Sequence, residues 1–328
     1  AHQGKTLAGD LALRVKTTRT GIWVALLLEI LILVALTSRI GGEPYFQSTF
    51  LNYSNISQVL RAVSFIAIMA VGQAVVIISG GIDLAAGSIL GLAGVVTALA
   101  LNENLPVSIS ILVGLAVGLV AGGGSGLLVT KAKLPPFIAT LGMLSVARGV
   151  AYAITGGETI RNLPKNFLFI GQGELVGVPI PVWVMLIFAV VIAYFLSATM
   201  WGRYAYAIGG NEEAARLSGV AVNWMKLLFY LMAGLSAAVA GVLYVARFGV
   251  GQSTAGLGYE LDVIAAAVIG GVSLSGGRGT ITGVILGSIL MGVLRNGLVL
   301  LNVSAYWQQV AIGAVIILAV ILDRRSKA

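Results

Sequence analysis

Long uninterrupted apolar runs constrain this chain more than any other feature of its sequence. The first and last runs are 21-GIWVALLLEILILVALTS-38 and 305-AYWQQVAIGAVIILAVIL-322. A transmembrane helix needs about 20 consecutive, mostly apolar residues. Only 10% of the 328 residues are charged and 58% are hydrophobic, whereas roughly 25% are charged in a soluble domain. The sequence therefore predicts an all-α, polytopic membrane protein.

The apolar runs predict about ten transmembrane helices, at residues 21–39, 56–79, 85–101, 107–130, 136–154, 181–199, 226–247, 260–273, 280–301 and 304–322. If the N-terminus is cytoplasmic, 13 of the 20 Lys and Arg residues fall on the cytoplasmic side, as the positive-inside rule favours. We therefore expect both termini in the cytoplasm. The expected regions are a cytoplasmic tail 1–20, a transmembrane domain 21–323 with an external loop 155–181 and a cytoplasmic segment 200–225, and a cytoplasmic tail 324–328.

Composition excludes several classes of function. The chain has no cysteine and a single histidine, His2, so we expect no disulfide, no metal site and no catalytic imidazole. The net charge of +8 is spread in short clusters between apolar runs, which argues against a nucleic-acid partner. The triplet 4-GKT-6 lacks the upstream glycine of a phosphate-binding loop. Any uphill transport must therefore draw energy from an ion gradient or from another polypeptide.

Few ionisable residues fall within the predicted spans. Asp83 follows two glycines and precedes a small-residue helix, which favours a helix N-cap over direct substrate binding. Glu260 and Asp262 are expected in the first turn of a helix, where the helix dipole stabilises carboxylates. Arg148 and Arg295 could pair with these acids or extend toward the membrane surface. No proton relay is evident.

Glycines follow a pattern in two parts of the chain. Gly114, Gly118, Gly122 and Gly126 recur every four residues, and such a ridge allows helices to pack closely in a membrane. Two other stretches, 80-GGIDLAAGSILGLAG-94 and 270-GGVSLSGGRGTITG-283, resemble each other, and the first also resembles 258-GYELDVIAAAVIGG-271. Either pairing is consistent with an internal duplication, parallel or inverted, as transporters often have.

The stretch 209-GGNEEAARLSG-219 is unlike its apolar surroundings. Asn211 is a good N-cap, two glutamates follow in the first turn, and Gly219 is a suitable C-terminal stop. The stretch therefore predicts a short helix with charged and apolar sides, suited to another protein's groove, although an ordinary loop helix would have the same pattern. The candidate contact residues are Asn211, Glu212, Glu213, Ala214, Arg216, Leu217 and Gly219.

The same stretch carries the pattern EAA-x-x-x-G at residues 213–219, which is typical of importer permeases. The wider sequence is more specific, and its segments are 72-GQAVVIISGGIDLAAGSILGLAG-94, 137-FIATLGMLSVARGV-150, 202-GRYAYAIGGNEEAARLSGV-220 and 258-GYELDVIAAAVIGGVSLSGGRGTITG-283. From about residue 50 to the C-terminus the chain resembles the ribose-type sugar ABC permeases, within the branched-chain amino acid and sugar permease superfamily.

This resemblance implies a subunit that spans the bacterial inner membrane and has a fold similar to the type II, vitamin B12-type importers. It implies three partners: a second permease subunit, usually identical, a cytoplasmic ATPase with two fused nucleotide-binding domains, and a periplasmic or lipid-anchored sugar-binding protein. ATP and Mg would be bound by the ATPase, with no cofactor on this chain. The helix at 211–219 would then be the coupling helix, flanked by Arg203 and Lys226, and the cargo would be ribose or a similar pentose.

The resemblance also implies roles for two further sets of residues. The external loop and the segment 248–260 would receive the binding protein, through Glu158, Arg161, Lys165, Gln252 and Tyr259. Polar and aromatic residues of the spans could line the sugar path, namely Gln58, Gln73, Asp83, Asn296, Trp307 and Gln308.

Other functions stay open at this point. A stand-alone ion-coupled carrier would use intramembrane acids such as Glu29 as a proton relay, although Glu29 is better explained as an inward-packed, neutralised carboxyl. An ABC permease for another sugar, a nucleoside or an autoinducer-type ligand would have much the same sequence. A membrane enzyme or scaffold would need a cluster of catalytic side chains at one interface, which the sequence lacks.

Overall fold

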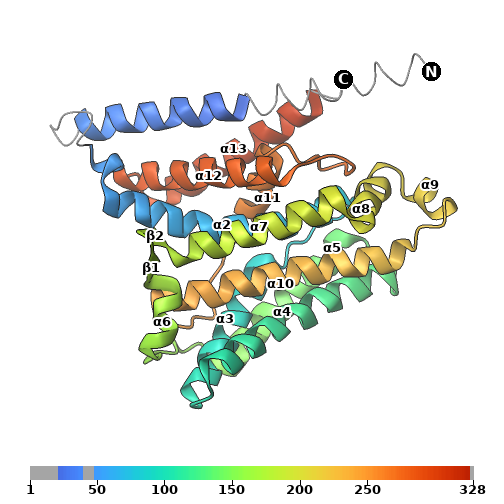
Figure 1. The fold of residues 1–328 in the computed structure, drawn as a ribbon, viewed down its shortest axis with the longest axis horizontal. Coiled ribbons are helices and arrows are strands. Elements are labelled where there is room, and N and C mark those ends of the chain that lie inside the picture. Colours follow the sequence, from blue (N-terminus) through green and yellow to red (C-terminus); the bar gives the residue numbers. More distant parts are fainter. Residues whose placement is uncertain (1–20, 40–47, 326–328) are drawn as a thin grey trace.

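A computed structural model describes residues 21–39 and 48–325 of the chain (Figure 1). Apart from one two-stranded hairpin, β1 (Glu174–Leu175) with β2 (Val178–Pro179), its regular elements are helices. They are Gly21–Arg39, η2 (Thr49–Leu51), α2 (Tyr53–Ile78), α3 (Ala86–Asn102), α4 (Val107–Thr130), α5 (Pro136–Thr155), α6 (Lys165–Gln172), α7 (Ile180–Ala198), α8 (Met200–Gly210), α9 (Glu212–Leu217), α10 (Val222–Phe248), α11 (Tyr259–Ile269), α12 (Ile281–Leu300) and α13 (Ala305–Arg325). The predicted tail 1–20 and residues 326–328 lie outside the described residues.

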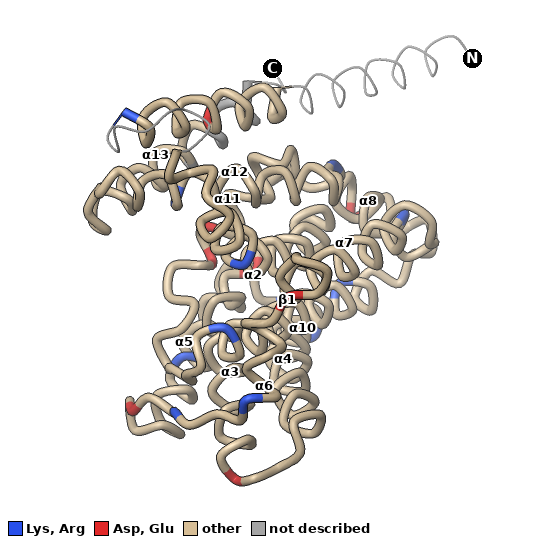
Figure 2. Tube along the Cα trace, turned by 60° about the vertical axis from the view of Figure 1, so that its left-hand side comes forward, with Lys and Arg blue, Asp and Glu red and all other residues tan. Residues whose placement is uncertain are grey.

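Seven of the described helices are long and apolar enough to cross a membrane: Gly21–Arg39, α2, α4, α5, α7, α10 and α12. The long helices run between two ends of the molecule, one carrying α6 and the hairpin (the α6 end) and the other carrying α8 and α9 (the α9 end; Figure 1). Charged residues are few along them (Figure 2). The prediction of a polytopic helical membrane protein is confirmed.

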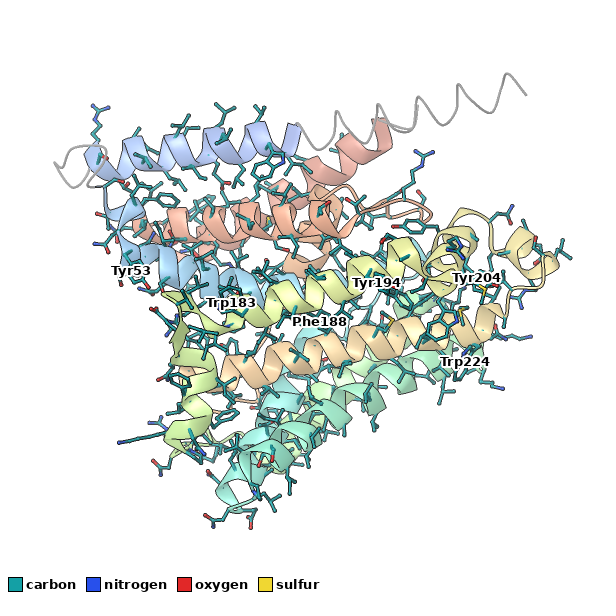
Figure 3. All side chains as sticks on the ribbon, viewed as in Figure 1. Tyr53, Trp183, Phe188, Tyr194, Tyr204 and Trp224 are labelled. Atoms are coloured by element: carbon teal, nitrogen blue, oxygen red, sulfur yellow. The ribbon has the colours of Figure 1, made fainter. Side chains whose placement is uncertain are left out.

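Aromatic side chains lie near both ends of the bundle. Tyr53 and Trp183 lie toward the α6 end, and Tyr204 and Trp224 toward the α9 end (Figure 3). Tyr and Trp are enriched where a protein meets the headgroup region of a bilayer. These four residues favour a membrane normal along the long helices.

Three of the predicted spans, 85–101, 260–273 and 304–322, are not among these seven helices. The predicted span 85–101 corresponds to α3, which has 17 residues, and the predicted span 304–322 corresponds to α13. The predicted span 260–273 is wrong as a full crossing, because α11 has 11 residues and rises about 16 Å, roughly half of the hydrocarbon thickness. Its apolar run continues, but the helix stops at Gly270, followed by Gly271 with φ 84°.

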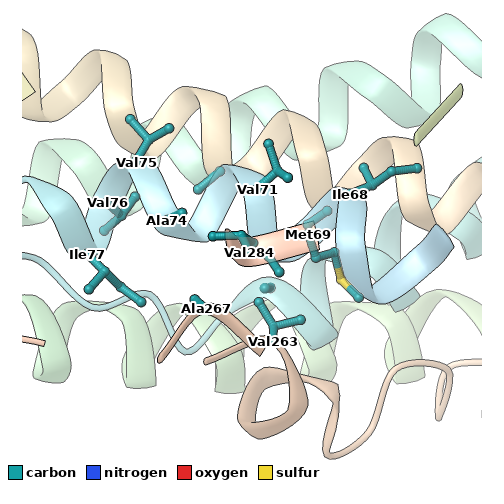
Figure 4. Packing of buried hydrophobic residues seen from close by; sticks show 14 of the residues in the cluster. Ile68, Met69, Val71, Ala74, Val75, Val76, Ile77, Val263, Ala267 and Val284 are labelled. Carbon is teal, nitrogen blue, oxygen red and sulfur yellow. The ribbon is translucent and has the colours of Figure 1, made fainter. Parts of the chain in front are cut away.

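The hydrophobic core is centred on α2. From Val63 to Ile78 every residue of this helix is buried, and it contacts α7, α10, α11 and α12. Val71 and Ile77 lie in the same cluster as Val263 of α11 and Val284 of α12 (Figure 4). A helix that is apolar on all sides is a central helix of a bundle, and α2 has that position.

The glycine ridge of α4 packs as the sequence predicts. A Cβ on Gly118 would lie 2.4 Å from the carbonyl oxygen of Gly234 in α10, and one on Gly122 would lie 2.4 Å from that of Tyr230. At Gly114 the close neighbour is Thr97 of α3. The ridge therefore brings the α4 backbone directly against α10 and α3, a close approach that small residues permit in membranes.

Two irregular segments, 79–85 and 250–258, precede the short helices α3 and α11. The second segment meets the first turn of α3, where a Cβ on Gly87 or on Gly256 would lie within 2.4 Å of the other's carbonyl oxygen. From this contact α3 runs to the α6 end, where Asn102 donates to the Arg161 carbonyl, while α11 runs to the α9 end. Irregular backbone at this depth is tolerated when it is buried in protein. The opposed directions favour the inverted pairing of 80–94 with 258–271.

Candidate functional site

The α8–α9 segment at the α9 end has the local structure that its sequence predicts. Asn211 is the N-cap of α9, and its Oδ1 accepts a hydrogen bond from the N–H of Ala214 at 2.9 Å. Helix α9 ends at Leu217, and Gly219 follows in the left-handed region with φ 86°. The short capped helix is therefore confirmed.

Two cations hold Glu212, the first residue of α9. Its Oε1 lies 2.9 Å from Arg216 Nη2, and its Oε2 accepts from Lys226 Nζ of α10. Burial would raise the pKa of Glu212, but the hydrogen bond and charge of Lys226, together with Arg216, lower it below its usual value. An ionised Glu212 thus ties α9 to the start of α10. Arg203, the other predicted flank, is exposed on α8, and nothing in the described chain bonds it to α9.

The two faces of α9 differ in exposure. Ala215 is buried and its carbonyl accepts from the N–H of Val220, which fixes the inner face. Leu217 is 80% exposed, and Glu213 and Ala214 are exposed beside it. A protruding leucine flanked by charges is the pattern of a helix that docks in another protein's groove.

Helix α8 joins α9 to the core through backbone contacts. A Cβ on Gly209 would lie 1.8 Å from the carbonyl oxygen of Ile78 and 2.6 Å from the nitrogen of Gly277. The N–H of Gly277 donates to that same Ile78 carbonyl at 2.8 Å, and Tyr206 Oη donates to the Gly279 carbonyl at 3.0 Å. The end of α2, the 270–280 loop and α8 therefore meet at one junction.

The predicted external loop 155–181 contains helix α6 and the hairpin, which the sequence did not predict. An isolated bridge joins Ile160 to Gly251, with two N–H···O bonds of 2.9 Å. The loop thus lies beside the irregular segment 250–258, which is part of the other predicted docking element, 248–260. Glu158, Arg161 and Lys165 are exposed on this end.

The other two docking candidates lie deeper. Gln252 is half-buried, and Tyr259 packs edge-on against Tyr244 at 6.3 Å between ring centroids. Arg295 lies over the Tyr259 ring at 5.8 Å and within 2.9 Å of Asp262. Tyr259 is therefore half-buried against α10 and α12, and the predicted pairing of Arg295 with an acid is confirmed.

A buried cation at the α6 end was missed from the sequence. Arg61 of α2 is 5% exposed and lies 2.9 Å from Glu174 of the hairpin. It also donates to the Gly171 carbonyl at 2.9 Å, while Tyr53 Oη donates to Glu174 at 2.7 Å. The hydrogen bond from Tyr53, and then those from Ser57 and Arg61, hold the pKa of Glu174 below its usual value despite partial burial. An arginine inside an apolar run was a usable signal, but its partner was not foreseeable.

The residues predicted for a sugar path lie on three helices and the segment 79–85, and they are not bonded to one another among the described residues. Gln73 and Asp83 are buried, and Gln73 has no hydrogen-bond partner within residues 21–39 and 48–325. Asn296 exchanges hydrogen bonds with Asn55, while Gln58 and Trp307 are exposed. Gln308 donates to the carbonyl of Val303.

Three ionisable residues take positions that refine the prediction. Helix α3 has Ala85 as its N-cap, so the prediction for Asp83 was wrong by two residues; Asp83 Oδ1 instead accepts from the Ala85 N–H at 2.8 Å. Arg148 donates to the carbonyls of Ser253 and Ala255 rather than to an acid. Both carboxylate oxygens of Glu29 are buried without a partner in the described structure, as expected for an inward-packed carboxyl.

The buried helical core, the broken inner helices and the protruding capped helix together define a polytopic membrane transport subunit. The chain belongs to the family described as branched-chain amino acid transport system / permease component, whose pattern matches residues 55–320.

Curated relatives extend over most of the chain. The ribose import permease protein RbsC of Escherichia coli K12 is 42% identical over 92% of this chain and 93% of its own length. That of Bacillus subtilis 168 is 43% identical over 85% and 88%, and the E. coli L-arabinose transport system permease protein AraH is 36% identical over 85% of each chain. The resemblance found in the sequence is thereby confirmed.

Proposed function

We propose that this chain is the permease subunit of an ATP-driven importer that carries ribose or a closely related pentose across the bacterial inner membrane. The observation that carries the proposal is the 42% identity to a ribose import permease over 92% of the chain. The L-arabinose permease among its relatives supports a pentose and makes L-arabinose the first competing cargo.

The α8–α9 segment supplies the energetic part of the proposal. The chain has no phosphate-binding loop, so ATP and Mg are bound by a cytoplasmic ATPase with two fused nucleotide-binding domains. The exposed face of α9 around Leu217 docks on that ATPase. Its movement passes through α8 and the junction at Gly209 to the core helix α2, so nucleotide binding selects between two packed states.

The remaining architecture follows from the same proposal. Ten membrane-crossing or half-crossing helices, a fold of the type II importer kind, cytoplasmic termini and two identical permease subunits are expected. The α9 end faces the cytoplasm. At the α6 end, Glu158, Arg161 and Lys165 steer a sugar-binding protein onto the membrane complex.

Reconstitution tests the proposal. The chain, its cognate ATPase and its binding protein are placed in liposomes, and uptake of labelled ribose and L-arabinose is measured with ATP inside. Ribose should accumulate only when all three proteins and ATP are present. Uptake by the chain alone, driven by a proton or sodium gradient, would instead establish an ion-coupled carrier.

A second experiment addresses α9. Glu213→Lys reverses a charge on the exposed face and should weaken co-purification of the ATPase while membrane insertion is unchanged. Glu158→Lys, an equally exposed glutamate at the α6 end, is the matched control. Equal recovery of the ATPase with both variants would rule out α9 as its docking helix.

A further inference from the structure

A groove lies beside α9, between the end of α4 and the start of α10. It consists of two adjoining cavities of about 490 and 410 Å³. Both are lined by Thr130, Arg216 and Asn223, so they form one continuous depression. We call it the α4–α10 groove. Glu212, Arg216 and Lys226 belong to or flank the α9 docking segment, whereas the rest of the lining, including Lys131, Lys133 and Trp224, has no part in the proposed ATPase contact.

One half of the α4–α10 groove is cationic. Its lining includes Lys133, Arg216 and Lys226, and the adjoining half adds Lys131. Among the described residues that line the groove, Glu212 is the one carboxylate, and its two oxygens are already engaged by Arg216 and Lys226. The groove therefore has an excess of positive charge and suits an anion.

The short connection between α4 and α5 fixes the lysines at the rim. The N–H of Ala132 donates to the Leu127 carbonyl at 3.3 Å, and that of Leu134 to the Leu128 carbonyl at 3.1 Å. Lys133 has a positive φ of 55°, a conformation rare for a residue with a side chain. The backbone thus places Lys133 at the groove rather than leaving it on a free loop.

The other half of the groove is mainly apolar. It is lined by Val220, Ala221, Val222, Trp224 and Leu227. Trp224 is 60% exposed and lies near the α9 end of the bundle (Figure 3). Helix α4 ends and helix α10 begins at this level, so the apolar half is at the boundary between hydrocarbon and headgroups.

We infer that the α4–α10 groove binds an anionic phospholipid. The phosphate lies among Lys131, Lys133, Arg216 and Lys226, and an acyl chain follows the apolar half past Trp224. Basic pockets between helix ends at the membrane surface hold anionic headgroups in this way. A free phosphate would leave the apolar half unused, and the ATPase has the protruding face of α9, around Leu217, as its more accessible surface. The inference does not depend on which sugar is carried.

Lipid retention by the purified full-length chain tests this inference. The protein is incubated with mixed micelles containing equal amounts of phosphatidylglycerol and phosphatidylcholine, and bound lipid is counted by native mass spectrometry. The wild type should retain phosphatidylglycerol in preference. Lys131→Gln and Lys133→Gln should each lower its affinity about fivefold, since one cation near the surface contributes about 1 kcal/mol. Trp224→Ala should shorten retention without changing the headgroup preference.

The control is Lys165→Gln, an exposed lysine at the opposite end, which should bind phosphatidylglycerol like the wild type. The inference would be overturned if Lys165→Gln lost as much phosphatidylglycerol binding as the lysine variants of the groove. It would also be overturned if the wild type retained phosphatidylcholine as well as phosphatidylglycerol. Full displacement of the lipid by inorganic phosphate at the same concentration would overturn it too, because the apolar half would then contribute nothing. Complete expulsion of the lipid on adding the ATPase would assign the groove to that protein instead.

Discussion

At the scale of single residues, the contact between Arg61 and Glu174 links α2 to the β1–β2 hairpin. Arg61 is buried and also satisfies the carbonyl of Gly171, whereas Glu174 is partly exposed. The ion pair is therefore screened more than a fully buried one. Its role is to hold α6 and the hairpin against the core.

This contact predicts an acid-sensitive stability. Since the pKa of Glu174 is lower in the folded protein than its ordinary value, ionised Glu174 stabilises the fold above an ordinary glutamate pKa of about 4.3. That contribution is lost as the pH falls through the lower, folded value. Thermal unfolding in detergent should therefore show the wild type losing its advantage over Glu174→Gln as the pH falls below about 4.3. A difference in thermal midpoint between the two proteins that stays constant over this pH range would contradict the prediction.

The junction at Gly209 predicts a steric effect. Gly209→Ala places a methyl group 1.8 Å from the Ile78 carbonyl oxygen, so backbone must move, at a typical cost of about 1–3 kcal/mol or more. Its neighbour Gly210 has no atom within 4 Å of a Cβ. Gly209→Ala should lower the thermal midpoint and abolish uptake, while Gly210→Ala should affect neither strongly. Similar behaviour of the two variants would exclude a tight junction.

Residue-level prediction from sequence succeeded where the interaction is local. The Asn211 cap and the Gly219 stop depend on residues within one or two turns, so the sequence carries them completely. The pair of Arg61 and Glu174 spans 113 positions, and only the folded helices bring it together. Tyr259 was predicted to lie at the surface. Its actual neighbours come from α10 and α12, which only the folded helices bring beside it.

At the scale of elements, the long helices were predictable because lipid requires about 20 apolar residues in each. Helix α6 was not, because an eight-residue helix is unstable alone. It forms because Phe167 is buried and Gly171 packs on the Arg247 backbone. The break after α11 was visible as glycines, but their effect on helix length depends on the close packing of α11 against α12.

Helix α9 gives a prediction at this scale. With six residues, it depends strongly on its cap, and Asn211→Ala should cost about 1 kcal/mol of local stability. The expected result is weaker association with the ATPase and faster amide hydrogen exchange in residues 212–217. Asn211→Ser, which keeps a capping oxygen, should restore both. If Asn211→Ser does not restore ATPase association and amide protection, loss of the capping oxygen is not the cause of the Asn211→Ala effect.

At the scale of the whole molecule, the absence of cysteine makes topology directly measurable, since any single cysteine is unique. Ser218→Cys lies at the α9 end and Val176→Cys lies at the α6 end, where Val176 is 88% exposed. In intact cells a membrane-impermeant thiol reagent should label Val176→Cys only, and Ser218→Cys should react after the membrane is opened. Labelling of both from outside would contradict the proposed orientation.

The meeting of α8, the end of α2 and the 270–280 loop has a mechanical consequence. Gly209, Ile78 and Gly277 touch through main-chain atoms, and a main-chain contact has no side-chain rotamers that can change to absorb a displacement. The junction is therefore mechanically stiff, and movement of one segment moves the other. A small displacement of α8 is therefore passed directly to the end of α2 and to the 270–280 loop.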